Sequence, residues 1–412
     1  MKTFALLLAA TIVATPLAAR TIMVAAGTGA QEALQTALIE AQPGDTVRLA
    51  AGRFALVDGV SLDVEGVTVR GAGPGKTILD FTGQKGEGEG LLITSNNVVI
   101  RDLAVENAKG NGIKSKGSDG ISFVNLRVEW TGGAKSTNGA YGVYPVSSKH
   151  VLIDNVYVKG ASDAGIYVGQ SQQIVVRNSK AEGNVAGIEI ENSYNADVHD
   201  NVATGNTGGI LVFDLPDLPQ QGGHSIRLFH NQVIANNHPN FAGVGNIVAS
   251  VPPGTGVMVM ANRNVHVFDN DIKDNSGNAV MLVAYQNKFT DAAYNPLPRD
   301  ITVRGNRYAG NGAKPGFPGG TELAAAVGGT LPAVMWDGVT AFVVPGAASA
   351  GAAANSRMAV ADLPMLNLNL KDQGTPLTSA RPEMVTGAPT VTIEEPPVVV
   401  LPAAQEARAK GK

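Results

Sequence analysis

The chain has 412 residues, with 50 Gly, 22 Pro, no Cys and a formal net charge of −4. The absence of Cys excludes disulfides, a thiol nucleophile and a Cys-based zinc site. Charged residues are only 16% of the chain and no Lys/Arg run is present, so we expect no nucleic-acid partner. Many Gly, Asn and Val/Ile residues with so little charge indicate β-structure with many turns rather than a helical bundle.

Residues 1–19 are predicted to be a secretory signal peptide. Lys2 precedes the apolar run from Phe4 to Val13, and the small-residue stretch Pro16-Leu17-Ala18-Ala19 follows it. The apolar run is too short to span a bilayer, and no other run reaches about 18 residues. We therefore expect cleavage near Ala19, no membrane span, and a periplasmic or extracellular protein.

Residues 31–40 are predicted to form an amphipathic helix, because Leu34, Leu38 and Ile39 follow a helical spacing. The segment from Thr46 to Ala50 then has the short β-rich character of a strand. Stacked strands leave open ends that invite pairing with other chains. We expect the helix to cap such an end.

An internal repeat organises the middle of the chain. A small residue followed by a β-branched residue recurs with steps of 30, 23, 22, 22, 47 and 23 residues. Each unit contains short alternating stretches separated by turn residues, which is typical of half-buried strands. The β-branched members of the repeat are Ile113, Val143, Ile166, Ile188, Ile210, Val257 and Val280.

Units of 22–23 residues with no helical pattern cannot bury their own apolar face, so they must stack. A coil of strands of this length, stacked at about 4.8 Å per turn, is a parallel β-helix. Asn residues recur five positions apart, and we interpret them as amide ladders at the turns. They are Asn201/Asn206, Asn231/Asn236, Asn270/Asn275 and Asn306/Asn311.

We expect the β-helix domain to span residues 20–345, with clear repeats over about 92–312. Beyond residue 312 the pattern fades, although Leu331 to Val344 could pack on the last coil. Residues 346–412 are rich in Pro and Ala with few bulky side chains, and we predict a mostly disordered tail there.

The stretches GASDAGIYVGQS (160–171), EGNVAGIEIENS (182–193) and TGGILVFDLP (207–216) resemble right-handed parallel β-helix proteins of the pectate-lyase-like and NosD-like superfamily. The resemblance is closest to a group of exported bacterial β-helix-repeat proteins without an established function, and it covers about residues 25–345. It implies an all-β solenoid with an exported, carbohydrate-related role. This fold hosts lyases, hydrolases, epimerases and scaffolds, so no catalytic motif is carried over.

Four long insertions flank the same predicted sheet, at residues 129–138, 214–223, 238–253 and 285–298. Insertions collected on one face of a repeat protein usually mark its binding face. Two walls beside a flat sheet would make an elongated groove, which suits a polymer. We therefore expect a polysaccharide-binding groove over this sheet.

Alternation predicts which side chains form the floor of this groove, since successive residues of a strand face opposite ways. One outward column contains Lys114, Tyr144, Tyr167, Glu189, Leu211, Met258 and Met281. A second column, two residues further along each strand, contains Lys116, Val146, Gly169, Glu191, Phe213, Met260 and Val283. The columns run from basic residues through tyrosines and glutamates to apolar residues.

Three functions are compatible with these columns. In a uronate lyase or epimerase, Lys114 or Lys116 would neutralise the substrate carboxylate and Tyr144 or Tyr167 would move the proton, with Glu189 beside them. In a glycoside hydrolase, Glu189 and Glu191 would be the acid/base pair, with Asp163 or Asp214 as a further partner. In a binding scaffold, the charges are solvated and the sheet, including Phe213, only binds.

The sequence also offers candidate sites for a metal ion and for a protein partner. Glu189, Glu191 and Asp214 together could hold a hard cation such as Ca²⁺. The six His residues show no i, i+4 spacing, so we expect no zinc site. The apolar half of the floor, from Leu211 to Met281, is a candidate surface for a protein partner or a covering loop.

Overall fold

The computed structural model describes residues 19–346 and 356–411, apart from Glu87. The predicted signal peptide lies outside the described residues except for Ala19, so its cleavage stays a prediction. No helix in the described ranges has the length and apolar character needed to cross a membrane.

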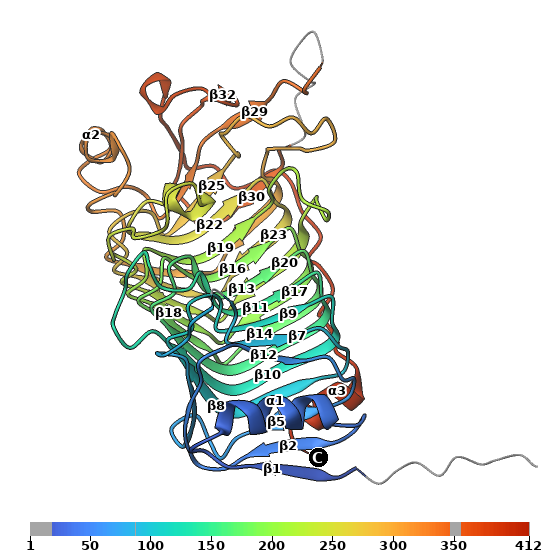
Figure 1. Cartoon of the computed structure of the whole chain (residues 1–412). Helices are drawn as coiled ribbons and strands as arrows, with labels where there is room; N and C mark the ends of the chain where they lie inside the picture. The colour runs from blue at the N-terminus through green and yellow to red at the C-terminus, as the bar shows by residue number, and fades with distance from the viewer. Residues whose placement is uncertain (1–18, 87, 347–355, 412) are drawn as a thin grey trace, which may run out of the picture.

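The described chain winds into a solenoid whose strands stack coil upon coil in three rows (Figure 1). The pairings between described strands are parallel, apart from the last pair, β31–β33. The first row, here called sheet B, carries the repeat found in the sequence. It contains β4 (Val60–Leu62), β7 (Leu91–Ile93), β9 (Ile113–Lys116), β11 (Tyr141–Val146), β13 (Ala164–Gly169), β16 (Ala186–Glu191), β19 (Gly208–Phe213), β22 (Thr255–Met260), β25 (Val280–Val283), β28 (Val334–Trp336), β31 (Met365–Asn367) and β33 (Glu383–Val385).

The other two rows form sheet A, because three long strands bend across both. The second row contains β1 (Thr21–Val24), β2 (Thr46–Leu49), β5 (Thr68–Arg70), β8 (Val99–Glu106), β10 (Asp119–Glu129), β12 (Lys149–Lys159), β14 (Gln172–Arg177), β17 (Tyr194–His199), β20 (His224–Phe229), β23 (Arg263–Phe268), β26 (Arg299–Arg304) and β30 (Met358–Val360). The third row contains β3 (Gly52–Ala55), β6 (Thr77–Asp80), the ends of β8, β10 and β12, and then β15 (Lys180–Glu182), β18 (Val202–Thr204), β21 (Gln232–Ile234), β24 (Asp271–Lys273) and β27 (Arg307–Ala309).

The interior is built from the positions that the repeat predicts. The β-branched residues from Ile113 to Val280 pair in register along sheet B and are fully buried in one continuous core. The predicted Asn ladders are confirmed. Asn206 donates to Asn236 over 2.8 Å, Asn236 to Asn275 over 3.0 Å, and Asn275 to Asn311 over 3.0 Å.

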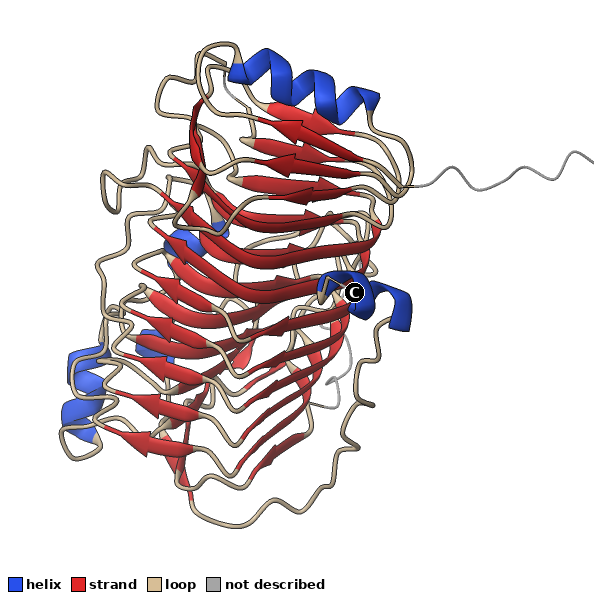
Figure 2. Cartoon of the chain, turned by 90° about the horizontal axis from the view of Figure 1, so that it is seen from below, coloured by secondary structure: helices blue, strands red, loops and turns tan. Residues whose placement is uncertain are grey.

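Helix α1 (Ala30–Glu40) covers the first coil, as predicted (Figure 2). Leu34 and Leu38 are buried against this coil. Ile39 was expected to share their face, but it is 67% exposed, because it follows Leu38 directly around the helix.

The solenoid continues beyond residue 312, where the sequence pattern fades. Helix α2 (Gly320–Ala326) is an insertion before β28, and β30 and β31 extend sheets A and B. A small two-stranded sheet of β29 (Val339–Ala341) and β32 (Lys371–Asp372) and the 3₁₀ helix η2 (Leu377–Ser379) complete this end.

The prediction of a mostly disordered tail over 346–412 is corrected for residues 356–411 by these elements and by the segment that follows them. Residues 347–355 and 412 lie outside the described residues. Residues 389–411, here called the C-terminal strap, run back along the solenoid and end in helix α3 (Ala403–Ala409) beside the early coils (Figures 1 and 2). Glu395 pairs with Arg227 and Arg304, each at 2.9 Å. Contacts with the outer face of sheet A hold the strap in place. The composition of the strap alone does not reveal these contacts.

Candidate functional site

The outer face of sheet B carries the two predicted columns in the predicted register. Tyr167 pairs with Glu189, and Glu189 pairs with Leu211, on adjacent strands. Tyr167 and Leu211 belong to a second apolar cluster, which is separate from the core that contains Ile166 and Ile188. The odd and even positions therefore face opposite ways, as the alternation requires.

Part of the chain covers the middle of this face, over which a groove was predicted. Residues 238–253, here called the covering segment, include the 3₁₀ helix η1 (Ile247–Ser250) and place Val248 and Val251 on the floor. Tyr294 and Leu297 from the loop 285–298 join the same cluster. Glu189 is consequently only 1% exposed.

Three carboxyl groups lie together beneath this cover. Glu191 Oε1 accepts a hydrogen bond of 2.6 Å from the Tyr167 hydroxyl. Asp163 Oδ2 accepts hydrogen bonds from the Tyr141 hydroxyl at 3.3 Å and from Asn246 Nδ2 at 3.1 Å. Both carboxyl oxygens of Glu189 are buried without a hydrogen-bond partner in the described structure. Glu189 is thus the carboxyl of this cluster that has neither a hydrogen-bond partner in the described structure nor access to solvent.

Burial keeps protons on this carboxyl cluster. Desolvation raises the pKa of Glu189 well above its ordinary value, and the nearby Asp163 and Glu191 carboxyls raise it further. Desolvation also raises the pKa of Glu191 to about 7, against the lowering effect of the Tyr167 hydrogen bond. It raises the pKa of Asp163 to about 7, against the Tyr141 hydrogen bond. The cluster therefore offers both a proton donor and a proton acceptor near neutral pH.

Three tyrosines form one wall of the cluster. The rings of Tyr141, Tyr144 and Tyr167 lie with centroids 4.4 to 4.9 Å apart. Desolvation raises the pKa of Tyr144 to about 12 and that of Tyr167 well above its ordinary value. These hydroxyls therefore stay protonated at neutral pH and act as donors. Tyr141 and Tyr144 are half-buried, so the cluster approaches the surface at this end.

Lys114 and Lys116 lie next to the tyrosines. Lys114 Nζ forms a 2.8 Å ion pair with Glu89 Oε1 and lies 5.1 Å from the centroid of the Tyr144 ring. Lys116 is exposed. The structure thus places Lys114, Tyr144, Tyr167 and Glu189 along one face, but the Lys114 charge is already compensated by Glu89.

Asp214 and Phe213 are engaged in contacts that hold the fold together rather than in the carboxyl cluster. The Asp214 carboxyl accepts hydrogen bonds from the backbone N–H groups of Gly222 and Gly223, which closes the loop 214–223. Phe213 is buried in the second apolar cluster. Neither side chain shares a hydrogen bond with the carboxyl cluster, although Asp214 contributes to the raised pKa of Glu191.

The chain matches the family described as "Right handed beta helix region" over residues 65–217. These residues comprise the regular coils that carry Tyr144, Tyr167 and Glu189. The chain is a right-handed parallel β-helix.

Solved structures with similar folds include modules of two Azotobacter vinelandii mannuronan C-5 epimerases. The AlgE6 A-module is 16% identical with a TM-score of 0.48, over 68% of this chain and 82% of that chain. The AlgE4 A-module is 16% identical with a TM-score of 0.48, over 86% and 96%. An alginate lyase from Paenibacillus sp. is 19% identical with a TM-score of 0.45, over 71% and 97%. A search of curated proteins found no match.

The β-helix gives no support to the predicted Ca²⁺ site. Within residues 19–346 and 356–411, Glu87 apart, no group of three or more His, Cys, Asp or Glu side chains is placed to hold a metal ion. Asp214 is instead engaged by backbone N–H groups, as described above. Glu189 and Glu191 belong to the buried carboxyl cluster with Asp163.

Three residues of the site were missed by the sequence patterns. Tyr141 lies two positions before the inward-facing Val143, so alternation places it inside, yet its ring packs on Tyr144 and Tyr167. Glu89 lies one coil before Lys114, so the stacking of coils could have identified it. Asn246 belongs to the covering segment, where no periodicity predicts which side chain reaches Asp163.

Proposed function

We propose that this β-helix hydrolyses a glycosidic bond of a polysaccharide at the cluster of Asp163, Glu189 and Glu191. The observation that carries the proposal is the Glu189 carboxyl, which is fully buried without a partner beside two carboxyls with pKa values of about 7. A buried carboxyl that keeps its proton at neutral pH is suited to general acid catalysis. Structural carboxyls are normally hydrogen-bonded when buried.

The three carboxyls have distinct roles in the proposed reaction. Glu189 donates its proton to the glycosidic oxygen as the bond from that oxygen to the anomeric carbon breaks. Glu191, the carboxyl with the Tyr167 hydrogen bond, accepts a proton from the water that attacks the anomeric carbon. The Cα atoms of residues i and i+2 of one strand lie about 6.5–7 Å apart on the same face. This spacing allows the two carboxyls to reach the separation used in glycoside hydrolysis. Asp163 binds a sugar hydroxyl.

The substrate enters from the tyrosine end of the cluster. Tyr141 and Tyr144 are half-buried there and offer aromatic faces on which a sugar ring can stack. The exposed Lys116 beside them favours an acidic polysaccharide. Entry requires Asn246 to leave Asp163, which moves the covering segment away from the acids.

Uronate lyase or epimerase chemistry is the second candidate, supported by the Lys114 ammonium group near the Tyr144 ring. In this reaction Lys114 would stabilise the substrate carboxylate while a tyrosine removes the neighbouring C–H proton. Loss of the leaving group gives an unsaturated uronate, and return of the proton on the other face gives the epimer. The ion pair with Glu89 and the raised pKa values of the tyrosines make this candidate second.

The test is product analysis after incubation with alginate, pectate and heparinoids, with and without Ca²⁺. The proposal predicts new reducing ends without absorbance from unsaturated uronate, and loss of this activity in Glu189→Gln and Glu191→Gln. The exposed loop residue Asp217 supplies the matched control, so Asp217→Asn should retain activity. Unsaturated products that disappear with Lys114→Ala and Tyr167→Phe would instead support the lyase. Binding without any product would leave a polysaccharide-binding scaffold and overturn the proposal.

A further inference from the structure

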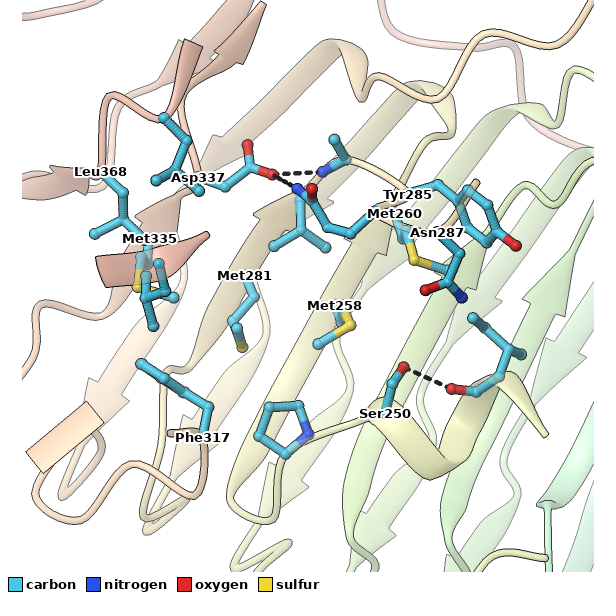
Figure 3. Close-up of a pocket in the computed structure, with 17 residues that line it drawn as sticks. Ser250, Met258, Met260, Met281, Tyr285, Asn287, Phe317, Met335, Asp337 and Leu368 are labelled. Carbon is cyan, nitrogen blue, oxygen red and sulfur yellow. Dashed lines mark hydrogen bonds between the residues drawn. The ribbon is translucent and has the colours of Figure 1, made fainter. Parts of the chain in front are cut away.

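A second feature of the covered face lies beyond the carboxyl cluster, over β22, β25 and β28. It is a pocket of about 270 Å³, here called the methionine pocket (Figure 3). The covering segment contributes Ser250 at one edge, and Phe317 lies at another. Residues 284–287 and the C-terminal coils, including Leu368, close the remaining sides.

The floor of the methionine pocket consists of thioethers. Met258, Met281 and Met335 pair in register on three successive strands, and Met260 lies beside them. All four side chains are buried, and all four line the pocket. Methionine is flexible and polarizable, so such a floor can adapt its shape to an apolar molecule.

The pocket offers no cationic side chain to a ligand, and the protein itself engages its one carboxyl group. None of its lining residues is Lys or Arg, and Asp337 is the one lining residue with an acidic side chain. Asp337 Oδ2 accepts hydrogen bonds from the Ala284 N–H at 2.7 Å and Gln286 Nε2 at 3.3 Å, and its Oδ1 accepts one from the Val339 N–H at 3.0 Å. Figure 3 shows Tyr285, Asn287 and Ser250 along one side, where neutral polar groups meet the apolar floor.

We propose that the methionine pocket binds one uncharged, mainly apolar molecule with a single hydrogen-bonding end. At roughly 30 Å³ for a group the size of a water molecule or methylene, the volume holds about nine such groups. A cavity of about 150 Å³ lined by apolar side chains stays dry and binds benzene. The larger methionine pocket therefore suits an alkyl chain of about eight carbons or a bicyclic ring. This inference does not rest on the proposed hydrolysis.

The experiment uses the full protein labelled with ¹³C at the methionine methyl groups. Octan-1-ol is titrated in, and octanoate and octyltrimethylammonium serve as charged analogues of the same chain length. The proposal predicts saturable shifts for Met258, Met260, Met281 and Met335. Met23 and Met384, which are 62% and 43% exposed, are internal controls that should not shift. The charged analogues should bind at least ~10-fold more weakly. The pocket has no cationic side chain to pair with octanoate, and the Asp337 carboxyl that could pair with octyltrimethylammonium is already held by three hydrogen bonds from the protein.

Two variants separate binding from folding. Met281→Trp fills the pocket and should abolish the octan-1-ol shifts, whereas the volume-conserving Met281→Leu should retain binding. Ser250→Trp obstructs the exposed edge without changing the floor, so it should also weaken binding if Met281→Trp does not fold. Absence of shifts in the four floor methyls, or equal binding of the charged analogues, would overturn the proposal. Glu189→Gln should still bind octan-1-ol, so failure of the hydrolase proposal would be seen separately.

Discussion

Replacing Glu191 by Gln should change how the stability of the protein depends on pH. In the folded protein, burial raises the pKa of Glu191 from its ordinary 4.5 to about 7. Between these values the folded chain holds a proton that the unfolded chain has released. The stabilisation from this proton is complete below pH 4.5 and is lost as the pH rises through about 7.

The size of the effect follows from the two pKa values. A tenfold change in proton affinity corresponds to about 1.36 kcal/mol, so the difference between 4.5 and about 7 corresponds to about 3 kcal/mol. The Gln side chain in Glu191→Gln cannot ionise, so this variant does not lose that stability as the pH rises. Relative to the wild type, the variant should therefore gain about 3 kcal/mol in free energy of unfolding between acidic and mildly alkaline pH.

Urea unfolding followed by circular dichroism measures this difference at a series of pH values between about 4 and 8.5. Asp217→Asn, in the neighbouring loop, is the matched control and should follow the wild-type curve. If the difference in free energy of unfolding between Glu191→Gln and wild type stays constant across this range, burial does not raise the pKa of Glu191, and the reasoning is refuted. A difference of the opposite sign would place a cation beside Glu191.

Three further predictions concern the scaffold. Deleting the C-terminal strap should lower the free energy of unfolding, because the deletion exposes Leu152 and Val175. The lost burial of Val399 and Leu401 alone corresponds to about 3–6 kcal/mol. An unchanged thermal midpoint would contradict the docking of the strap. Asn236→Ala should lower the free energy of unfolding by about 1–3 kcal/mol, because it leaves the side-chain amides of Asn206 and Asn275 partly unpaired inside the ladder. An unchanged urea unfolding curve would mean that the ladder contributes little to stability. Gly209→Ala should lower the free energy of unfolding by about 1–3 kcal/mol, because its Cβ would lie 2.4 Å from Val233 Cγ1. Gly75→Ala is the control and should be tolerated, because its Cβ would meet nothing within 4 Å. Equal effects of the two variants on the thermal midpoint would contradict the close packing at Gly209.

The solenoid could be predicted from the sequence because its determinants are local and repeated. The step from Val143 to Ile166 to Ile188 determines both the length of each coil and the side on which Tyr167 and Glu189 lie. The paired Asn residues indicated which turns stack. Helix α1 could be recognised by its own spacing, although the exposure of Ile39 depends on the coil it covers.

The cover of the site could not be predicted, because it depends on contacts between distant segments. The covering segment has no periodicity, so its docking through Val248, Val251 and Asn246 is determined only by the shape of the folded floor. The same holds for the C-terminal strap, whose Pro/Ala-rich composition indicates disorder. Its order comes from Arg227, Arg304 and the outer face of sheet A.

The hydrolase proposal is tested most directly by a crystal structure of Glu189→Gln with an oligosaccharide of the polysaccharide that the protein binds most tightly. We expect a glycosidic oxygen within hydrogen-bonding distance of the residue 189 side chain, a sugar ring against Tyr144, and Asn246 displaced from Asp163. An oligosaccharide bound on another face, with the covering segment still closed over Asp163, would contradict it.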